Sequence, residues 1–479
     1  MNTGITINAR KTAKYALTGI VMLTSSASAT YAQQASAYDP LRPGLDTDEA
    51  TTNQTDQSTN ATNTRAPVQR TNAPQPIRLL SNQPQSPDLP PPPPPLTQRE
   101  ANPFEPVGIR VGAFRLYPVL ELTSVFSNNV RTDHTAKLKD GGLRIAPSLR
   151  LQSNWIRHSL DINANSEHIF YKKANDLNSN TLNASSALRL DVRRGTTLLH
   201  TTTYQLSETS SSSSEVPGTA IGNRRDHELS YTAALSHRFN RVVATLTGGI
   251  DWLFFDDVKL SGGGTENNID REYIEPSARL RIAYDVSTAL TPFAEVAYTP
   301  RIHKKTLDRN GFARDSHGFR TSAGVGFNLS SIWDGEVALT FEHRNFDDNR
   351  LKDINSPGLT ATVNWRPTHL STVSFVSSTS IDESSTTGVS GTRNFDANLN
   401  ISHKFRENLT GNLTFGINYD DFVGTGNDDI TFTAQAGFAY DIHSKMQWIT
   451  NYHLIRLKSG THDNSYTENR ISTGVRFRL

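Results

Sequence analysis

Charged residues recur at every second position in several segments of the chain, out of phase with apolar residues. Arg279 and Arg281, for example, flank Leu280. Successive side chains of a β-strand point to opposite faces, so each segment would have one apolar and one polar face. Charges gathered on one face could pair across strands or filter ions in a water-filled interior. The pattern predicts these lumen-lining residues: Arg144, Arg150, Arg189, Asp191, Glu228, Arg279, Arg281, Glu295, Arg320, Glu336 and Glu342.

Other chemistry has little support in the sequence. The 14 histidines are scattered without HExxH spacing, cysteine is absent, and neither GxSxG nor a phosphate-binding glycine-rich loop occurs. Pairs of aspartates at 256–257, 347–348 and 428–429 could form cation-binding rims, but solvated loop carboxylates are the preferred interpretation. An Asp/His pair near His317 or His343 is a weaker alternative. We predict no catalytic residue, no metal ligand, no cofactor and no enzyme.

The elements that would position these charges are strands. Alternation with period two runs from about residue 115 almost to the last residue, and 369–379 is its weakest stretch. An even strand number would leave both ends of the chain on the periplasmic side. We predict an all-β, up-and-down antiparallel transmembrane barrel of about 18 strands, with 16 as the alternative: 116–127, 142–153, 157–170, 180–193, 196–207, 226–239, 241–255, 271–284, 288–301, 317–330, 332–345, 357–366, 369–379, 392–405, 408–420, 428–442, 445–457 and 468–479.

The connections alternate in length along the chain. Short turns are expected near 154–157, 193–196, 239–241 and five later positions, and long polar loops such as 207–226 and 257–270 lie between them. Short turns at one end and long loops at the other are typical of outer-membrane barrels. Aromatic residues gather near the expected strand ends, as in the two interfacial girdles of such barrels.

Composition excludes several classes of protein. Apolar residues make up only 35% of the chain, and the mean hydropathy is −0.50. No window of 18 apolar residues follows the N-terminus, so only a closed sheet could cross a membrane. The formal net charge of +1, with 48 basic and 47 acidic residues, gives no sign of a nucleic-acid partner.

The N-terminal quarter differs from the rest. Residues 1–32 combine a basic start at Arg10, Lys11 and Lys14, an apolar stretch and a small-residue region. This predicts a signal peptide cleaved after Ala32, with cleavage after Ala29 as the second choice. Residues 33–106 are polar and proline-rich, which predicts a disordered periplasmic linker. A periplasmic partner could bind this linker, although a leader without a partner is the preferred interpretation. The barrel would occupy residues 107–479.

The last segment has a recognisable pattern of its own. Ile471, Val475, Phe477 and Leu479 share one face, opposite Ser472 and Arg476 among others. This resembles the terminal strand that the barrel-assembly machinery reads, although that signal usually ends in an aromatic residue and here ends in leucine. The predicted partners are therefore this machinery, outer-membrane lipid and lipopolysaccharide.

The segment from Asn102 to Val130, NPFEPVGIRVGAFRLYPVLELTSVFSNNV, resembles the opening of the putative β-barrel porin 2 family of Gram-negative bacteria. The resemblance is carried by Gly108, Gly112, the sequence Leu116–Tyr117–Pro118, Phe126 and the sequence Asn128–Asn129–Val130. It would cover about residues 104–479. It implies an outer-membrane barrel, and it permits export of surface polysaccharide as one activity of barrels of this general type.

These observations favour a passive aqueous channel for small hydrophilic solutes in the outer membrane of a Gram-negative bacterium. A barrel that exports surface or extracellular polysaccharide with a periplasmic partner is the first alternative. A structural or adhesive surface protein is the second. The near-equal numbers of acidic and basic residues predicted to face the lumen predict weak ion selectivity.

Overall fold

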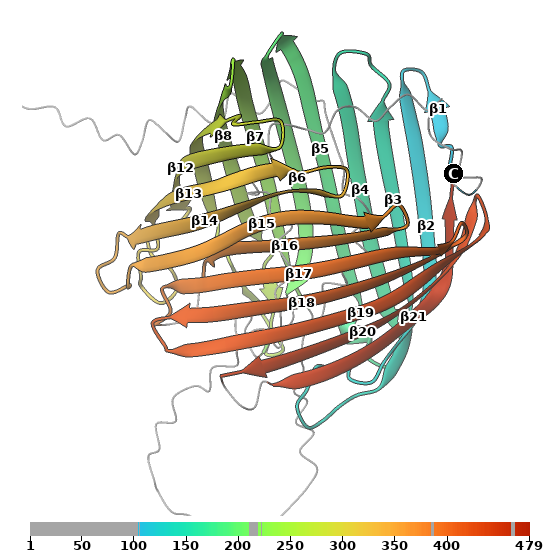
Figure 1. Cartoon of the computed structure of the whole chain (residues 1–479). Helices are drawn as coiled ribbons and strands as arrows, with labels where there is room; N and C mark the ends of the chain where they lie inside the picture. Colours follow the sequence, from blue (N-terminus) through green and yellow to red (C-terminus); the bar gives the residue numbers. More distant parts are fainter. Residues whose placement is uncertain (1–103, 105, 210–218, 222, 385–387, 461–464) are drawn as a thin grey trace, which may run out of the picture.

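The computed structural model describes residues 104, 106–209, 219–221, 223–384, 388–460 and 465–479. Within these residues, 18 strands form one closed antiparallel ring, and the short strand β1 pairs with β2 beside it (Figure 1). The prediction of an 18-stranded barrel is confirmed, and the alternative of 16 strands is wrong. The signal peptide and nearly all of the linker predicted at 33–106 lie outside the described residues, and both stay predictions.

The described elements follow the chain in this order: β1 (Ile109–Val111), β2 (Phe114–Ser127), β3 (Asp140–Ser153), β4 (Ser159–Tyr171), the 3-10 helix η2 (Asn175–Leu177), β5 (Ser179–Arg193), β6 (Thr196–Thr209), β7 (Arg224–Phe239), β8 (Val242–Phe255), β9 (Val258–Lys259), β10 (Thr265–Glu266), β11 (Tyr273–Tyr284), β12 (Leu290–His303), β13 (Ser316–Asn328), β14 (Trp333–Phe346), β15 (Ile354–Thr368), β16 (Ser371–Asp382), β17 (Gly391–Arg406), β18 (Leu409–Val423), β19 (Asn427–His443), β20 (Met446–Ser459) and β21 (Tyr466–Arg478).

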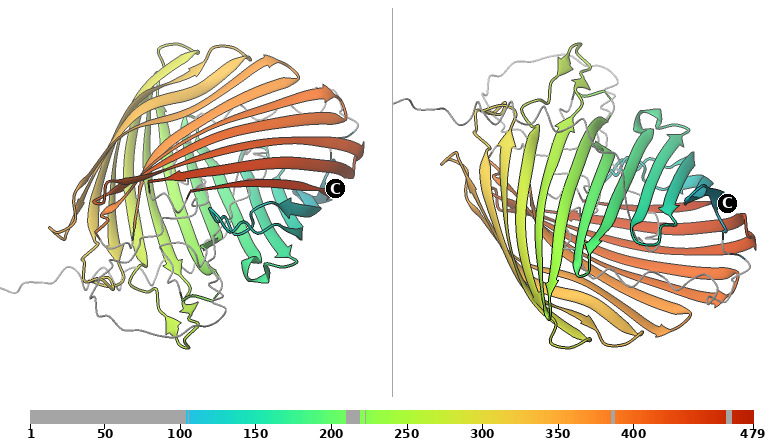
Figure 2. Two further views of the ribbon diagram at one scale, coloured as in Figure 1. Left: turned by 90° about the horizontal axis from the view of Figure 1, so that it is seen from below. Right: turned by 90° about the horizontal axis from the view of Figure 1, so that it is seen from above.

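The first and last strands of the ring close the barrel. β2 pairs with β21 from Val119 opposite Arg478 to Ser127 opposite Arg470. Gly474 lies in this seam, and a Cβ atom there would sit 2.0 Å from the carbonyl oxygen of Leu122. The closing seam therefore depends on a residue without a side chain. Strands on opposite walls cross at a large angle in Figure 2, as expected for the tilted strands of a barrel.

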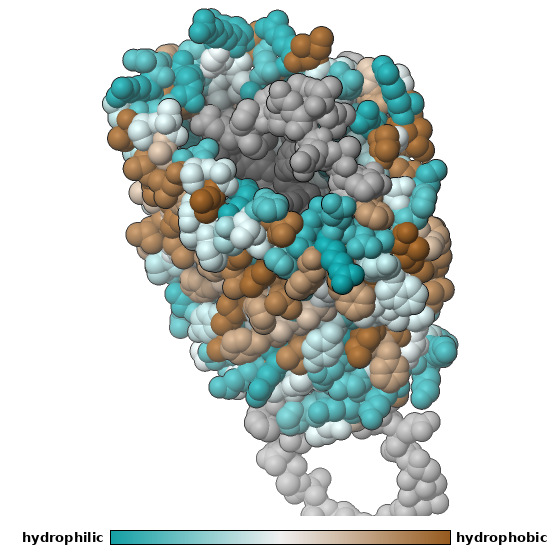
Figure 3. Space-filling view, turned by 45° about the vertical axis from the view of Figure 1, so that its right-hand side comes forward, coloured by the Kyte–Doolittle hydropathy of each residue, from teal (hydrophilic) through white to brown (hydrophobic). Residues whose placement is uncertain are grey.

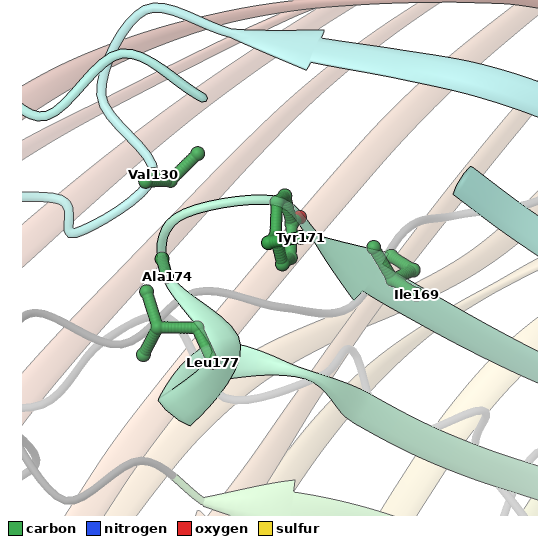
Figure 4. Packing of buried hydrophobic residues seen from close by; sticks show 5 residues of the cluster. All are labelled: Val130, Ile169, Tyr171, Ala174 and Leu177. Carbon is green, nitrogen blue, oxygen red and sulfur yellow. The ribbon is translucent and has the colours of Figure 1, made fainter. Parts of the chain in front are cut away.

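Short turns join the strands at one end of the barrel, and longer loops join most of them at the other. β7 and β8 are joined through Asn240, whose φ of 57° is a left-handed conformation that asparagine tolerates better than most residues. At the long-loop end, residues near 130 pack against the β4–β5 loop. Figure 4 shows this cluster of Val130, Ile169, Tyr171, Ala174 and Leu177. The first two long loops are thus fixed to one another by buried apolar contacts.

The outer face of the barrel is apolar. Leu280 and Ile282 of β11 are 44% and 43% exposed, whereas Arg281 between them is 5% exposed. Figure 3 shows apolar side chains across the middle of one face and hydrophilic ones towards both ends. Trp333 and Trp365 stack at 5.4 Å beside the short turns, where an interfacial girdle is expected. Among the described residues, no helix is long and apolar enough to cross a membrane.

Candidate functional site: the inner wall of the barrel

Ion pairs connect strands β11 to β14 on the face opposite the exposed apolar side chains. Arg279 lies 3.4 Å from Glu295 on β12, and Arg320 of β13 donates to Glu342 of β14 at 2.9 Å. Arg281 donates through both terminal nitrogens to the carboxylate of Glu336, at 2.9 and 2.5 Å. Six of the residues predicted from alternation therefore form one group of alternating sign.

The pair of Arg281 and Glu336 also shows that this face of the sheet is the inner face of the barrel. β12 and β13 separate their strands in the sheet, and neighbouring strands lie about 4.8 Å apart. A side chain of β11 can reach β14 only where the sheet curls around it, on the concave side. The guanidinium of Arg281 also lies over the ring of Phe293, 3.5 Å from the centroid. These side chains therefore point into the barrel.

The charged group continues towards the long loops through residues that the alternation pattern included only in part. Arg344 is 1% exposed, and its Nη2 lies 3.3 Å from Glu275 and 3.5 Å from Glu342. Arg301 of β12 also pairs with Glu275. The sequence analysis did not single out Arg301, because it placed the strand end at this residue. The signal was present, since Ala297, Thr299 and Arg301 continue the phase of Glu295.

A second ion-paired group spans the closing seam. Glu121 of β2 accepts hydrogen bonds from Arg144 at 2.8 Å and from Arg476 at 2.6 Å. Arg144 also donates to Glu167 at 2.7 Å. Nearer the short turns, Arg150 donates to Asp161 at 2.9 Å. Glu121 was not singled out from the sequence, although it alternates with Leu120 and Leu122.

The remaining predicted residues lie apart from both groups. Arg189 and Asp191 pair with each other along β5 at 3.0 Å. Glu228 lies on β7, opposite Gln205 of β6. The structure thus distributes the eleven predicted residues over separate parts of the inner wall and does not gather them into one site.

Two broad stretches of the inner wall carry uncharged polar side chains. We call them the uncharged walls, and most of their side chains are partly exposed on the inside. The first, on β4–β8, comprises Asn163, Asn165, Asn183, Ser185, Thr201, Thr203, Gln205, Ser230, Thr232 and Thr247. Its rows end at the carboxylates of Glu228 on β7 and Asp251 on β8. The second, on β16–β20, comprises Ser374, Asn398, Asn400, Ser402, Asn412, Thr414, Asn418, Thr433, Gln435 and Asn451.

Three carboxylates above the second uncharged wall differ from the other acidic residues. Asp420 of β18 lies directly opposite Asp429 of β19, and Asp396 lies on the same face of β17. Their partners are neutral: Asn394 donates to Asp420 at 2.6 Å, and Ser459 donates to Asp429 at 2.6 Å. Within the described part of the chain, none of the three forms an ion pair. We call these residues the acidic patch.

Over the ranges that the structure covers, no group of three or more histidine or acidic side chains is placed to hold a metal ion.

Comparison with known protein families gives a match to this chain. Residues 102–479 match the profile of the family described as "Putative beta-barrel porin 2". The chain belongs to this porin family. The match covers all the described strands, and the resemblance expected from the segment 102–130 is confirmed. A search of curated proteins gave no match.

The solved structures that this porin resembles are only distantly similar to it. The siderophore receptor PirA from Acinetobacter baumannii is 8% identical with a TM-score of 0.37, and the similarity covers 76% of this chain and 80% of that one. OpdL from Pseudomonas aeruginosa is 13% identical with a TM-score of 0.38, covering 77% and 100%. OccAB4 from Acinetobacter baumannii is 12% identical with a TM-score of 0.38, covering 76% and 98%.

Proposed function

We propose that the protein is a passive channel of the Gram-negative outer membrane for small hydrophilic solutes. The observation that carries the proposal is the inner wall, whose side chains are polar or charged over most of the ring, while the outer face is apolar. A ring of about 18 strands encloses more space than wall side chains alone can fill, so water would occupy the remainder. The long loops would face the outside of the cell and the short turns the periplasm.

The charges of the wall favour neutral solutes over most of the path. The arginines of β11–β14 and of the closing seam pair with carboxylates on neighbouring strands, so their fields largely cancel at a distance. The two uncharged walls present amide and hydroxyl groups, which both donate and accept hydrogen bonds. Such groups can exchange hydrogen bonds with water and with the hydroxyl groups of a passing solute.

Liposome swelling tests this function with the full chain. Reconstituted protein should let small neutral sugars enter at rates that fall steeply as solute size increases. Liposomes without protein provide the baseline. The Leu280→Arg variant, whose new charge would face lipid, should assemble poorly and give correspondingly little swelling. Permeability no greater than that of protein-free liposomes would contradict the proposal.

Export of a neutral polysaccharide is a second candidate, favoured by the continuity of the uncharged walls. A glycan chain presents hydroxyl groups along its whole length, and each uncharged wall extends over five neighbouring strands. Such a barrel would need a periplasmic partner, for which residues 33–106 are the proposed contact. If the barrel exports a polysaccharide, deleting 33–106 while keeping the signal peptide should abolish export but leave channel conductance intact. If the protein is a simple channel, the same deletion should leave solute uptake by cells unchanged.

Assembly would depend on the closing strand. We propose that β21 is the segment read by the barrel-assembly machinery. Its outward residues include Ile471, 50% exposed, and Phe477, 43% exposed. Both would contact lipid after closure.

A further inference from the structure

The wall of the barrel is interrupted between β15 and β16. Their pairing runs from Thr368 opposite Ser371 to Ala361 opposite Ser377 and then stops. β16 nevertheless continues to pair with β17 as far as Asp382 opposite Thr392. Residues 378–382, all of them described, therefore have a partner strand on one side only. We call residues 378–382 the folded-in segment.

The sequence of β15 explains where the pairing ends. Continuing the register would place Leu359 opposite Thr379 and Pro357 opposite Ile381. Proline has no backbone N–H and cannot donate to the carbonyl of Ile381. The N–H of Leu359 donates to the Oγ1 of Thr379 at 3.3 Å instead of to its carbonyl. Two carbonyls of β16 are thus left without donors from β15.

Two arginines of the inner wall supply the missing donors. Arg320 of β13 donates to the carbonyl of Thr379 at 3.1 Å, and Arg301 of β12 donates to the carbonyl of Ile381 at 2.8 Å. In the sheet order, β14 and β15 lie between β13 and β16. The edge of the folded-in segment must therefore lie over the inner surface of β12–β14 and not in line with the wall.

Packing supports the same arrangement. By strand parity Thr379 and Ile381 should face lipid with Phe375, yet they are only 6% and 2% exposed. Gly358 of β15 points inward, and a Cβ there would lie 2.5 Å from the Cβ of Thr379. Ile381 packs in a buried cluster with Phe346, Leu351 and Ile354. β15 therefore covers the outer side of the folded-in segment.

We propose that the folded-in segment limits the size of solutes that the channel admits, with Arg301 and Arg320 as the residues that position it. The inference rests on the proposed channel function. In an uninterrupted wall this part of β16 would add to the perimeter near the long loops. Lying inside β12–β15, it shortens the perimeter and fills one corner of the lumen with protein.

A double substitution should return the segment to the wall. Pro357→Thr supplies the missing N–H, and Gly358→Ala places a Cβ where Thr379 now lies. Because the folded-in segment lies over β12–β14, the inner perimeter at this level bypasses about three strands. Barrel diameter grows roughly linearly with strand number, so regaining those strands would raise the open area, and the conductance, about 1.4-fold. The swelling cutoff should move to larger sugars. The matched control is Pro292→Thr with Gly248→Ala, since a Cβ at Gly248 would meet nothing within 4 Å.

Arginine-to-lysine variants test whether Arg301 and Arg320 hold the folded-in segment in place, without removing their positive charge. Arg301→Lys with Arg320→Lys keeps a cation beside Glu275 and Glu342 but loses the second arm that reaches β16. Conductance should rise in the same direction as in the double substitution, with ion selectivity unchanged. Arg131→Lys, which changes an ion pair with Asp176 in the loops between β2 and β5, remote from β16, should leave conductance at the wild-type value.

Cysteine labelling reports the position of the segment directly, because the chain contains no cysteine. Ile381→Cys should be unreactive towards a lipid-soluble maleimide in the wild-type background and reactive when Pro357→Thr and Gly358→Ala are added. Labelling of Ile381→Cys in the wild-type background would overturn the inference but not the channel function. The same holds if the double variant is labelled and conducts but its conductance equals that of the wild type. Absence of conductance from the wild type and every variant would overturn the proposed channel function, and the inference with it.

Discussion

Arg281 of β11 and Glu336 of β14 form a two-pronged ion pair across two intervening strands. Neighbouring residues Leu280 and Ile282 point the other way and are exposed. Because this contact can form only on the concave side of the curved sheet, it shows that the charged face of β11 lines the inside of the barrel. It also predicts that a charged side chain is tolerated on the inner face of β11 and not on the outer face.

The first prediction concerns Leu280. Leu280→Arg should destabilise the barrel by up to about 2–4 kcal/mol, because it places a charge on the lipid face. Denaturant unfolding from lipid vesicles measures the difference. The companion variant, Arg279→Ser with Arg281→Ser, alters no lipid-facing surface and should still assemble. If the serine variant fails to assemble while Leu280→Arg folds normally, the faces of β11 are reversed.

The second prediction concerns the coupling of Arg281 and Glu336. Arg281→Gln and Glu336→Gln should each destabilise the barrel, because each leaves a partly buried partner without its counter-charge. The double substitution should cost less than the sum, with a coupling energy of about 0.5–3 kcal/mol. A double-mutant cycle from unfolding curves measures this. Strict additivity would mean that the pair makes no energetic contact.

The third prediction revises the expected ion selectivity. Since the arginines of the inner wall are paired and the acidic patch is not, the channel should prefer cations. Reversal potentials in a salt gradient measure the preference. Changing Asp396, Asp420 and Asp429 together to Asn should remove most of it. The same triple variant with an unchanged reversal potential would refute this role of the patch.

The fourth prediction concerns closure. Gly474→Ala should impair assembly, because its Cβ would lie 2.0 Å from the carbonyl oxygen of Leu122 in the seam between β2 and β21. Gly248→Ala makes the same chemical change in open space and should assemble normally. Heat-modifiable migration on gels separates closed barrels from unfolded chains. Equal assembly of both variants would argue against the close approach at this seam.

Much of the fold was predictable because a barrel wall repeats one simple pattern. The alternation of Leu143 to Leu151 with polar residues is repeated around the ring, and the short turns, such as that at Asn240, mark the strand ends. Even the weak segment 369–379 overlaps most of β16 (Ser371–Asp382), although its alternation is poor. The short strands β1, β9 and β10 were not predicted, since two or three residues are too few to show a period.

The contacts of the inner wall could not be predicted to the same extent. Alternation indicates that Arg320 faces inward, but its two partners lie on β14 and β16, and only the curvature of the sheet brings β16 within reach. The strand expected from the sequence begins at Pro357, whereas β15 begins at Ile354. The consequence of Pro357 and Gly358 depends on Arg301 and Arg320, which are distant in sequence, and so no local pattern could reveal it.

Planar-bilayer recording of the purified full chain tests the central claim most directly. A passive aqueous channel should produce discrete insertion steps of reproducible size, with a current proportional to voltage at low voltage and a moderate preference for cations. A protein that is folded by its heat-modifiable migration and yet gives no conductance steps would contradict the account.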